Sequence, residues 1–337
     1  MEKILITGGA GFIGSHTVVE LTKAGYSPVI VDDFSNSNQS AIRGIECIIK
    51  QSVKVYEGDC NDAQFMNDLF VAEQNITGVI HFAAYKAVGE SVEKPLQYYQ
   101  NNVGSLMVLL DVMKKNGVEN VVFSSSCTVY GEPDQLPVTE KSPIKPAESP
   151  YGNTKQVCEE ILEDVIKSDA DYKAIALRYF NPIGAHPSSH IGELPLGVPN
   201  NLIPFVTQTA AGHREQLTIF GDEYDTPDGT CVRDYIHVVD LAKAHVKALQ
   251  HFKNQNTPYY DVFNIGTGKG NSVLEVVKTF EKVSEQKLKY KIGDKRTGDV
   301  EQVFGDVEKA NNELHWKAAL TLEDALRDAW NWQKKLK

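Results

Sequence analysis

The chain has 337 residues, of which 42% are hydrophobic and 23% are charged, so it is long enough to bury a large core. Its 34 Lys and Arg against 45 Asp and Glu give a net charge of −11, which excludes a general electrostatic surface for nucleic acid. An anionic ligand would have to be bound locally, by helix N-termini and a few arginines.

The first half of the chain alternates short apolar runs with amphipathic stretches. We expect strands at 3–7, 28–32, 53–57, 78–82, 120–125 and 174–178. We expect helices at 14–24, 62–73, 98–116 and 151–168. This alternation predicts an α/β fold of Rossmann type, a doubly wound parallel sheet with helices on both faces.

The pattern changes after residue 181, where proline and glycine interrupt the segment 186–204. Strand-like runs return at 235–239 and 260–265, and helices are expected at 241–251, 272–283 and 322–332. We therefore expect a dinucleotide-binding domain over 1–180 and a smaller α/β substrate-binding lobe over 181–337, some of whose segments return to the first sheet.

A glycine loop links the first expected strand to the first helix, with the spacing Gly8-x-x-Gly11-x-x-Gly14. Glycine permits a tight turn, close backbone approach to a pyrophosphate, and close packing of helix on strand. Asp32 ends the second strand about 20 residues later, where a carboxylate can bind ribose hydroxyls and would repel a 2′-phosphate. The pattern predicts NAD rather than NADP.

A tyrosine and a lysine stand four residues apart at the start of an expected helix, as Tyr151 and Lys155. Residues at this spacing share a helix face, and an ammonium near a phenol lowers the pKa of the phenol. Ser124–Ser126 end the fifth strand, at the sheet edge where doubly wound folds bind ligands. These residues predict a tyrosine general base with a serine hydroxyl as partner.

The glycine loop, the serine strand and the Tyr-x-x-x-Lys pair together resemble the extended short-chain dehydrogenase/reductase family. The segments 81–91, 178–187, 199–202 and 229–238 resemble its UDP-glucose 4-epimerase branch, over essentially the whole chain. The resemblance implies a catalytic set of Tyr151 as base, Lys155 as its activator, and Ser126 as partner of the substrate 4-hydroxyl. It also implies a UDP-hexose substrate, galactose metabolism and a homodimer.

The resemblance further implies two sets of binding residues. The NAD-binding set is Gly8, Gly11, Phe12, Ile13, Gly14, Asp32, Asp33, Phe34, Ser35, Asn36, Ser37, Asp59, Cys60, Phe82, Ala83, Ala84, Tyr85, Lys86, Asn101, Ser126, Tyr151, Lys155 and Phe180. The substrate-binding set is Lys86, Ser126, Tyr151, Asn181, Asn200, Leu202, Arg233, Arg296, Asp299 and Val303. His81 and His237 lie in apolar strands and are expected to be core histidines.

The implied reaction is reversible oxidation at C4, in which Tyr151 takes the hydroxyl proton while a hydride passes to tightly bound NAD. The 4-keto sugar then turns over and is reduced from its other face. Some members of the branch have a tyrosine where this chain has Val303, and they act only on non-acetylated sugars. The smaller valine suggests that UDP-GlcNAc and UDP-GalNAc are also accepted.

Two alternatives remain open. One is epimerisation of another UDP-sugar, such as UDP-glucuronate or UDP-arabinose, because the difference lies at C5. The other is a nucleotide-sugar 4,6-dehydratase, which shares the fold but needs a Thr-Asp-Glu run after the serine strand. This chain has Ser126-Cys127-Thr128 there, without a carboxylate, which argues against dehydration.

The cysteines indicate a reducing compartment. Cys47, Cys60, Cys127, Cys158 and Cys231 are scattered and lack the paired spacing of a zinc site. We therefore expect free thiols, no metal and a cytoplasmic location. No stretch approaches the ~20 apolar residues of a membrane span, and the apolar run 4–6 is too short for a signal peptide, so no membrane partner is expected.

Overall fold

The computed structural model describes residues 1–168, 171–295 and 300–336. The strands are β1 (Lys3–Thr7), β2 (Ser27–Asp32), β3 (Lys54–Glu57), β4 (Ile76–His81), β5 (Asn120–Ser126), β6 (Lys173–Tyr179), β7 (Asn181–Ile183), β8 (Leu217–Phe220), β9 (Val232–Arg233), β10 (Tyr235–His237), β11 (Tyr259–Ile265), β12 (Asn271–Ser272), β13 (Tyr290–Gly293) and β14 (Gln302–Val303). The α-helices are α1 (Phe12–Lys23), α2 (Gln39–Ile49), α3 (Ala63–Ala72), α4 (Val88–Glu93), α5 (Pro95–Lys115), α6 (Pro150–Ser168), α7 (Leu202–Ala210), α8 (Val238–His251), α9 (Val273–Ser284), α10 (Glu308–Glu313) and α11 (Leu322–Lys335). Two 3₁₀ helices, η1 (Cys127–Tyr130) and η2 (Phe252–Asn254), complete the set.

Seven parallel strands form the central sheet, in the order β11-β6-β5-β4-β1-β2-β3. The strand order reverses between β1 and β4, which is the topological switch point where doubly wound folds bind ligands. The predicted fold class is therefore confirmed, and the six strands expected in the first half are all present. The strand expected at 260–265 is β11, which pairs along β6 at one edge of the sheet.

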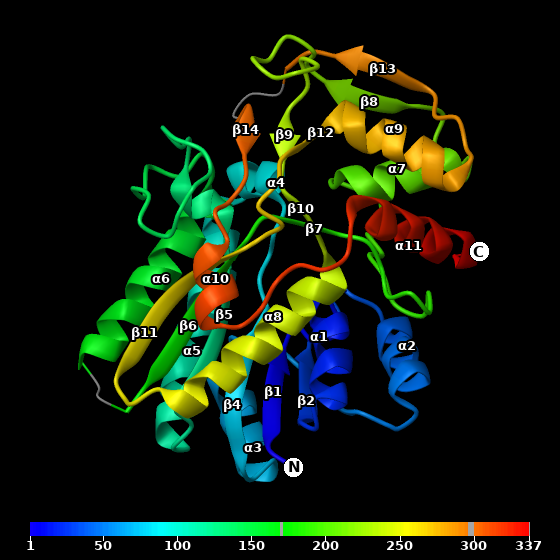
Figure 1. Ribbon diagram of the computed structural model, residues 1–337. Helices are drawn as coiled ribbons and strands as arrows, with labels where there is room; N and C mark the ends of the chain where they lie inside the picture. The colour runs from blue at the N-terminus through cyan, green and yellow to red at the C-terminus, as the bar shows by residue number, and fades with distance from the viewer. Residues whose placement is uncertain (169–170, 296–299, 337) are drawn as a thin grey trace.

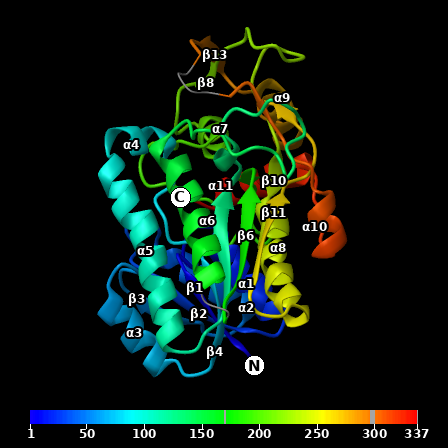
Figure 2. The same ribbon diagram turned by 90° about the vertical axis from the view of Figure 1, so that its left-hand side faces the viewer.

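Helices cover both faces of this sheet (Figures 1 and 2). The helices α1 and α8 pack together on one face, with side chains such as Val18, Leu241 and Leu249 in a common apolar cluster. The helices α3, α5 and α6 cover the other face, where Leu69 and Leu109 lie in a second cluster. Within the described residues, no helix is long and apolar enough to cross a membrane.

A smaller lobe stands beyond the carboxyl ends of the central strands, at the top of Figure 1. It contains the short pairs β8–β13 and β7–β10, the strands β12-β9-β14, and the helices α7, α9 and α11. Its own core joins residues from these elements, including Val206, Ile219, Phe280 and Leu326. The lobe therefore faces the same sheet edge as the switch point.

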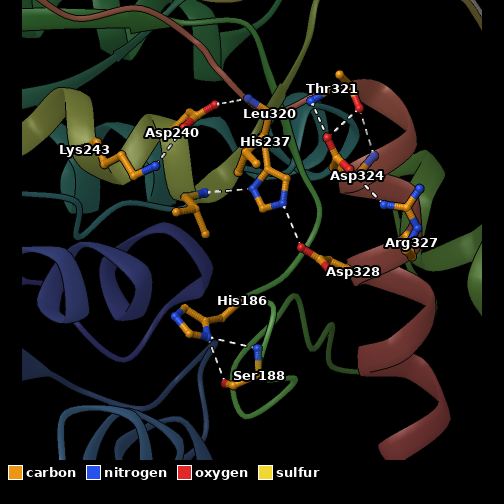
Figure 3. Close-up of polar contacts among 11 residues, drawn as sticks. His186, Ser188, His237, Asp240, Lys243, Leu320, Thr321, Asp324, Arg327 and Asp328 are labelled. Atoms are coloured by element: carbon orange, nitrogen blue, oxygen red, sulfur yellow. Dashed lines mark hydrogen bonds and ion pairs between the residues drawn. The ribbon is translucent and has the colours of Figure 1, made fainter.

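Polar contacts attach the C-terminal helix α11 to this assembly (Figure 3). The ring of His237 accepts the backbone N–H of Val239 at Nδ1, so its Nε2 carries the proton and lies 3.2 Å from an Asp328 oxygen on α11. The Asp240 carboxylate accepts the backbone N–H of Leu320, 2.7 Å away. A reciprocal capping box between Thr321 and Asp324 then starts the helix.

The structure differs from the sequence expectation at two kinds of place. The strand expected at 235–239 ends at His237, because that ring accepts the backbone N–H of Val239 and caps α8. The helix therefore begins at Val238, three residues before the expected start at 241. Apart from β10, the short strands of the lobe were not expected, and neither were the helices α2, α4, α7 and α10. The strands β7, β9, β12 and β14 have only two or three residues, too few to show an alternating pattern. His81 and His237 are buried and hydrogen bonded, as predicted.

Candidate active site

The glycine loop packs tightly into the switch point. Gly8 has φ of +69°, and a Cβ there would lie 2.9 Å from the backbone nitrogen of Ala83, just beyond β4. A Cβ on Gly14 would lie 2.2 Å from the carbonyl oxygen of Gly8. Both positions therefore require glycine. The helix α1 starts at Phe12 with no acidic residue in its first turn, so its free N–H groups and positive dipole end are available to a phosphate.

Asp32 fixes this loop to the end of β2. Its carboxylate accepts hydrogen bonds from the backbone of Ala10 at 2.9 Å, the backbone of Phe34 at 3.0 Å and the hydroxyl of Ser37 at 2.7 Å. Burial raises the pKa of the Asp32 carboxyl, and the hydrogen bonds oppose that shift. The exposed residues Asp33, Ser35 and Asn36 follow at the surface.

Two asparagines connect the segments that follow β3 and β4 to the helices α5 and α6. The Asn61 side chain donates to Asp59 at 3.0 Å and to Asn101 at 3.3 Å, while Cys60 is buried below. Asn102, which the sequence reasoning missed, bonds both backbone groups of Tyr85 and donates to the Thr154 hydroxyl at 3.1 Å. Gln97, Gln100 and Asn101 are amides in the same part of α5, so the sequence alone does not single out Asn102.

The three predicted catalytic residues come from two elements. Tyr151 and Lys155 lie in the first turns of α6, and Ser126 is the last residue of β5. The Ser149 hydroxyl accepts the backbone N–H of Gly152 and so caps the start of α6. The Ser126 side chain lies close enough to the Tyr151 phenol to lower its pKa.

Lys155 is buried and is held from β5. Its Nζ donates to the carbonyl of Ser124 at 2.6 Å, and lies 4.8 Å from the centre of the Phe123 ring and 5.9 Å from that of Tyr151. Burial lowers the pKa of Lys155 to about 8. Lys155 thus links α6, which carries Tyr151, to β5, which ends at Ser126.

The pKa of the phenol differs from the sequence expectation. Burial raises the pKa of Tyr151 to about 12, and the nearby Ser126 side chain opposes that shift only in part. The lysine was expected to favour phenolate, but its ammonium faces the Ser124 carbonyl and lies over the tyrosine ring, 5.9 Å from the ring centre. A phenolate here therefore requires further positive charge near the phenol oxygen.

The lobe contributes several predicted substrate residues to the same edge. Arg233 on β9 pairs with Val303 on β14, and Asn181 on β7 donates its backbone N–H to the carbonyl of Asp234 at 2.9 Å. The Asp234 carboxylate is buried and accepts the backbone N–H groups of Thr267 and Gly268, so it fixes this part of the lobe. Sequence reasoning missed Asp234.

Two contacts connect the lobe to the catalytic elements. The Cys127 side chain, at the start of η1, lies near both Tyr151 and Arg233. Phe180 and Val303, predicted on the cofactor and substrate sides respectively, pack in one apolar cluster with Tyr130 and Val138. Val303 is 8% exposed.

A third contact connects the loop after β4 to the segment before α7. Lys86 makes an ion pair with Glu193 at 3.3 Å, and the same carboxylate oxygen accepts from Asn201 at 2.5 Å. Asn201 is the N-cap of α7, between the predicted residues Asn200 and Leu202. Arg296 and Asp299 lie outside the described residues.

The other residues predicted to bind NAD surround the glycine loop between β1 and α1. Ile13, Phe82, Ala84 and Gly11 are half-buried at the carboxyl ends of β1 and β4 or at the start of α1. Ile13 and Phe82 pack against the apolar cluster of the α1 face. The predicted residues that the structure describes thus lie around one sheet edge and the lobe above it.

Comparison with known proteins gives the same family. The family model described as GDP-mannose 4,6 dehydratase matches residues 5–329. The chain is 51% identical to UDP-glucose 4-epimerase of Dictyostelium discoideum, over 98% of this chain and 96% of that protein. It is also 51% identical to UDP-glucose 4-epimerase of Bacillus subtilis, over 98% of this chain and 96% of that protein.

Among solved structures, the UDP-glucose 4-epimerase of Bifidobacterium longum in complex with NAD+ and UDP superimposes with a TM-score of 0.95. It is 49% identical and covers 99% of this chain and 98% of its own. A sequence likeness of this extent and a shared fold identify the branch as well as the superfamily. The chain belongs to the UDP-glucose 4-epimerase family of extended short-chain dehydrogenases/reductases.

Proposed function

We propose that this protein interconverts UDP-glucose and UDP-galactose by inverting C4 of the hexose, as an NAD-dependent isomerase of galactose metabolism. The observation that carries the proposal is the meeting of Ser126, Tyr151 and Lys155 at the sheet edge that also carries the glycine loop. The likeness to proteins named UDP-glucose 4-epimerase, at about half identity over the whole chain, supports it.

The described residues fit NAD. The bare N-terminus of α1 and the close glycine loop suit a pyrophosphate, and the Asp32 carboxylate suits the adenosine ribose. We propose that residues 1–180 bind NAD and that residues 181–337 bind the nucleotide sugar. Bound NAD supplies reversible oxidation at C4 of the sugar.

The chain's own residues handle the proton. We propose that the Tyr151 phenol oxygen takes the proton of the 4-hydroxyl and later returns it, while Ser126 bridges the phenol and the sugar oxygen. Because burial raises the pKa of Tyr151 to about 12, the base depends on positive charge brought by the bound nicotinamide and by Lys155. The buried ammonium of Lys155 also suits a ribose hydroxyl.

The lobe would hold the UDP portion firmly and the sugar loosely. Arg233 can bind diphosphate oxygens with its planar fork, and we propose Arg296 as its partner. Asn181, Asn200, Leu202 and Asp299 would contact the uridine, and Lys86 the sugar side. Loose contact with the hexose is required because the 4-keto sugar must present both of its faces.

Two further features are part of the proposal. We propose a homodimer formed through α5 and α6, supported by the exposed apolar side chains Val92, Leu96 and Met107 on α4 and α5. Light scattering is expected to give twice the chain mass of 37.4 kDa, and the mass of a single chain would contradict it.

A cytoplasmic location is supported by five cysteines that are all free.

A specificity prediction concerns Val303. Val303→Tyr is expected to reduce turnover of UDP-GalNAc at least about tenfold more than turnover of UDP-galactose, because the larger ring would fill space needed by the N-acetyl group. The ratio of the two kcat/KM values measures this effect. Since Val303 is packed in an apolar cluster, the melting temperature of the variant serves as control. An unchanged ratio in a folded variant would remove acceptance of acetylated sugars from the proposal.

The test of the function uses the purified protein with UDP-galactose and no added nucleotide. UDP-glucose is detected with a separate UDP-glucose dehydrogenase, whose NAD is added only after the protein has been heat-inactivated. Product formation would support 4-epimerisation with retained NAD. If none forms even with NAD supplied, the main proposal fails, and UDP-glucuronate and UDP-arabinose become the substrates to test.

Dehydration receives no support from the site, although the matching family model has a dehydratase name. The stretch from β5 through η1, residues 120–130, contains no Asp or Glu. A 4,6-dehydratase needs an acid–base carboxylate there, according to the family pattern. A sample of the same incubation can be made alkaline to detect a 4-keto-6-deoxy product. The carbonyl of that product absorbs in alkali and UDP-glucose does not, so absorbance would indicate dehydration.

A further inference from the structure

A buried ion pair lies directly behind the catalytic residues. Glu159 on α6 accepts two hydrogen bonds from Arg178 on β6, from Nε at 3.0 Å and from Nη2 at 2.6 Å. The side chains are only 9% and 6% exposed. The Ser125 hydroxyl on β5 donates to the same carboxylate at 2.5 Å. One carboxylate therefore joins α6, β5 and β6.

The pair continues into a polar chain beneath the lobe. Arg178 Nη1 donates to the Tyr130 hydroxyl at 3.1 Å, and that hydroxyl donates to Asn264 Oδ1 on β11 at 2.6 Å. Asn264 in turn donates to the carbonyl of Val138 at 3.0 Å. The network thus reaches both the segment after β5 and the edge strand of the sheet, and its members satisfy one another.

The position of Glu159 in α6 matters for the catalytic residues. Glu159 follows Lys155 by four residues and Tyr151 by eight, so the three lie along one side of the helix. Lys155 is bonded to Ser124 and Glu159 to Ser125, while the next strand residue is Ser126. Two successive polar contacts therefore set the register of α6 on β5 beside the catalytic serine.

Stability alone does not explain such a pair. Desolvation of two charges offsets most of their attraction, and apolar residues of similar volume often stabilise a core equally well. Apolar packing between α6 and the sheet tolerates small shifts, whereas hydrogen bonds to a carboxylate hold in only one register. The network is therefore suited to fixing geometry, which is what a reacting site requires.

Glu159 also contributes charge near Lys155. The groups that face the ammonium are His81 on β4, Tyr151 and Cys158 on α6, and Glu159 itself. His81 is held neutral by burial, which lowers its pKa to about 3. The negative charge of Glu159 raises the pKa of Lys155 against the effect of burial. Its loss would therefore leave Lys155 easier to deprotonate.

We propose that Glu159 is a positioning residue for the C4 epimerisation, which holds Tyr151 and Lys155 against Ser126 through its bonds to Ser125 and Arg178. This inference rests on the proposed function. Glu159 touches neither substrate nor cofactor in this role, and acts through the placement of α6 and the charge state of Lys155.

The test compares Glu159→Gln with the parent protein on UDP-galactose. We expect kcat to fall about 10- to 100-fold, with KM within about threefold, because ground-state binding is unaffected while the reacting groups are misplaced. The alkaline limb of the kcat profile should move to lower pH, since Lys155 loses a neighbouring negative charge. Glu159→Asp keeps the charge and should leave the limb near its parental position.

The controls separate positioning from folding. Glu160→Gln, an exposed neighbour on α6, should behave as the parent, and the NAD content of every variant is measured. If Glu159→Gln does not fold, Ser125→Ala becomes the deciding variant. It removes the hydrogen bond between Ser125 and Glu159 and keeps the charges of Glu159 and Arg178. We expect it to lower kcat about fivefold, with little change in melting temperature.

Two results would overturn the inference. One is a folded Glu159→Gln variant with parental kcat and an unmoved alkaline limb. The other, where that variant does not fold, is parental kcat in Ser125→Ala. An inactive parent protein would instead count against the proposed function, so the two failures are distinguishable.

Discussion

Replacing Tyr151 with phenylalanine is expected to lower kcat for UDP-galactose by about 10²- to 10⁴-fold, the usual contribution of a general base. That loss corresponds to about 3–5 kcal/mol of activation free energy. Even if the phenol oxygen makes a hydrogen bond, its loss costs only about 1 kcal/mol of folding stability. Activity should therefore collapse while the melting temperature and the NAD content stay close to those of the parent.

The matched control is Tyr290→Phe, which removes the hydroxyl of a phenol that is 43% exposed on β13. Its kcat should equal that of the parent. Substantial turnover by Tyr151→Phe, within about threefold of the parent, would assign the base to another group. The single-turnover rate with UDP-galactose is the sharper measurement, because it excludes product release from the comparison.

The second large effect is expected from Gly14→Ala. The new Cβ would lie 2.2 Å from the Gly8 carbonyl oxygen and 2.8 Å from the Gly9 Cα, and both are backbone atoms that cannot rotate away. Alanine gains about 1 kcal/mol of helix propensity, but this overpacking costs about 3 kcal/mol or more. We expect a net loss of stability and a purified protein largely free of NAD.

Gly89→Ala is the control, because Gly89 also lies in a helix, α4, and a Cβ there meets nothing within 4 Å. It should retain NAD and match or exceed the parental stability. Bound nucleotide is measured by absorbance after the protein has been denatured, and stability by urea unfolding. Parental NAD content in Gly14→Ala would show that the close approach of loop and helix is not needed for the cofactor.

The main sheet could be predicted because its strands carry a local signal. Buried parallel strands are continuous apolar runs, and β1 follows such a run from Lys3 to Thr7. The glycine loop and the Tyr151–Lys155 pair are also local, since each fits within one turn or helix. Family resemblance added the residues of the lobe, for which no local pattern exists.

The polar network behind the site could not be predicted in this way. Glu159 and Arg178 are 19 residues apart and meet only when α6 packs on β6; in the sequence Glu159 is one of several acids in an amphipathic helix. The raised pKa of Tyr151 has the same origin, because burial depends on the whole assembly. Such properties arise from tertiary contacts, and the local sequence of one segment does not indicate which other segment it contacts.

The course of the chain between sheet and lobe has a consequence for cooperativity. The chain leaves β6 for β7, returns with α8 to β11, leaves again for β12 and α9, and returns with α10 before ending in α11. Units joined by a single linker can unfold separately or swing widely. Here each crossing is anchored at both ends, so the lobe and the sheet are expected to melt in one transition, and substrate exchange is confined to small local displacements.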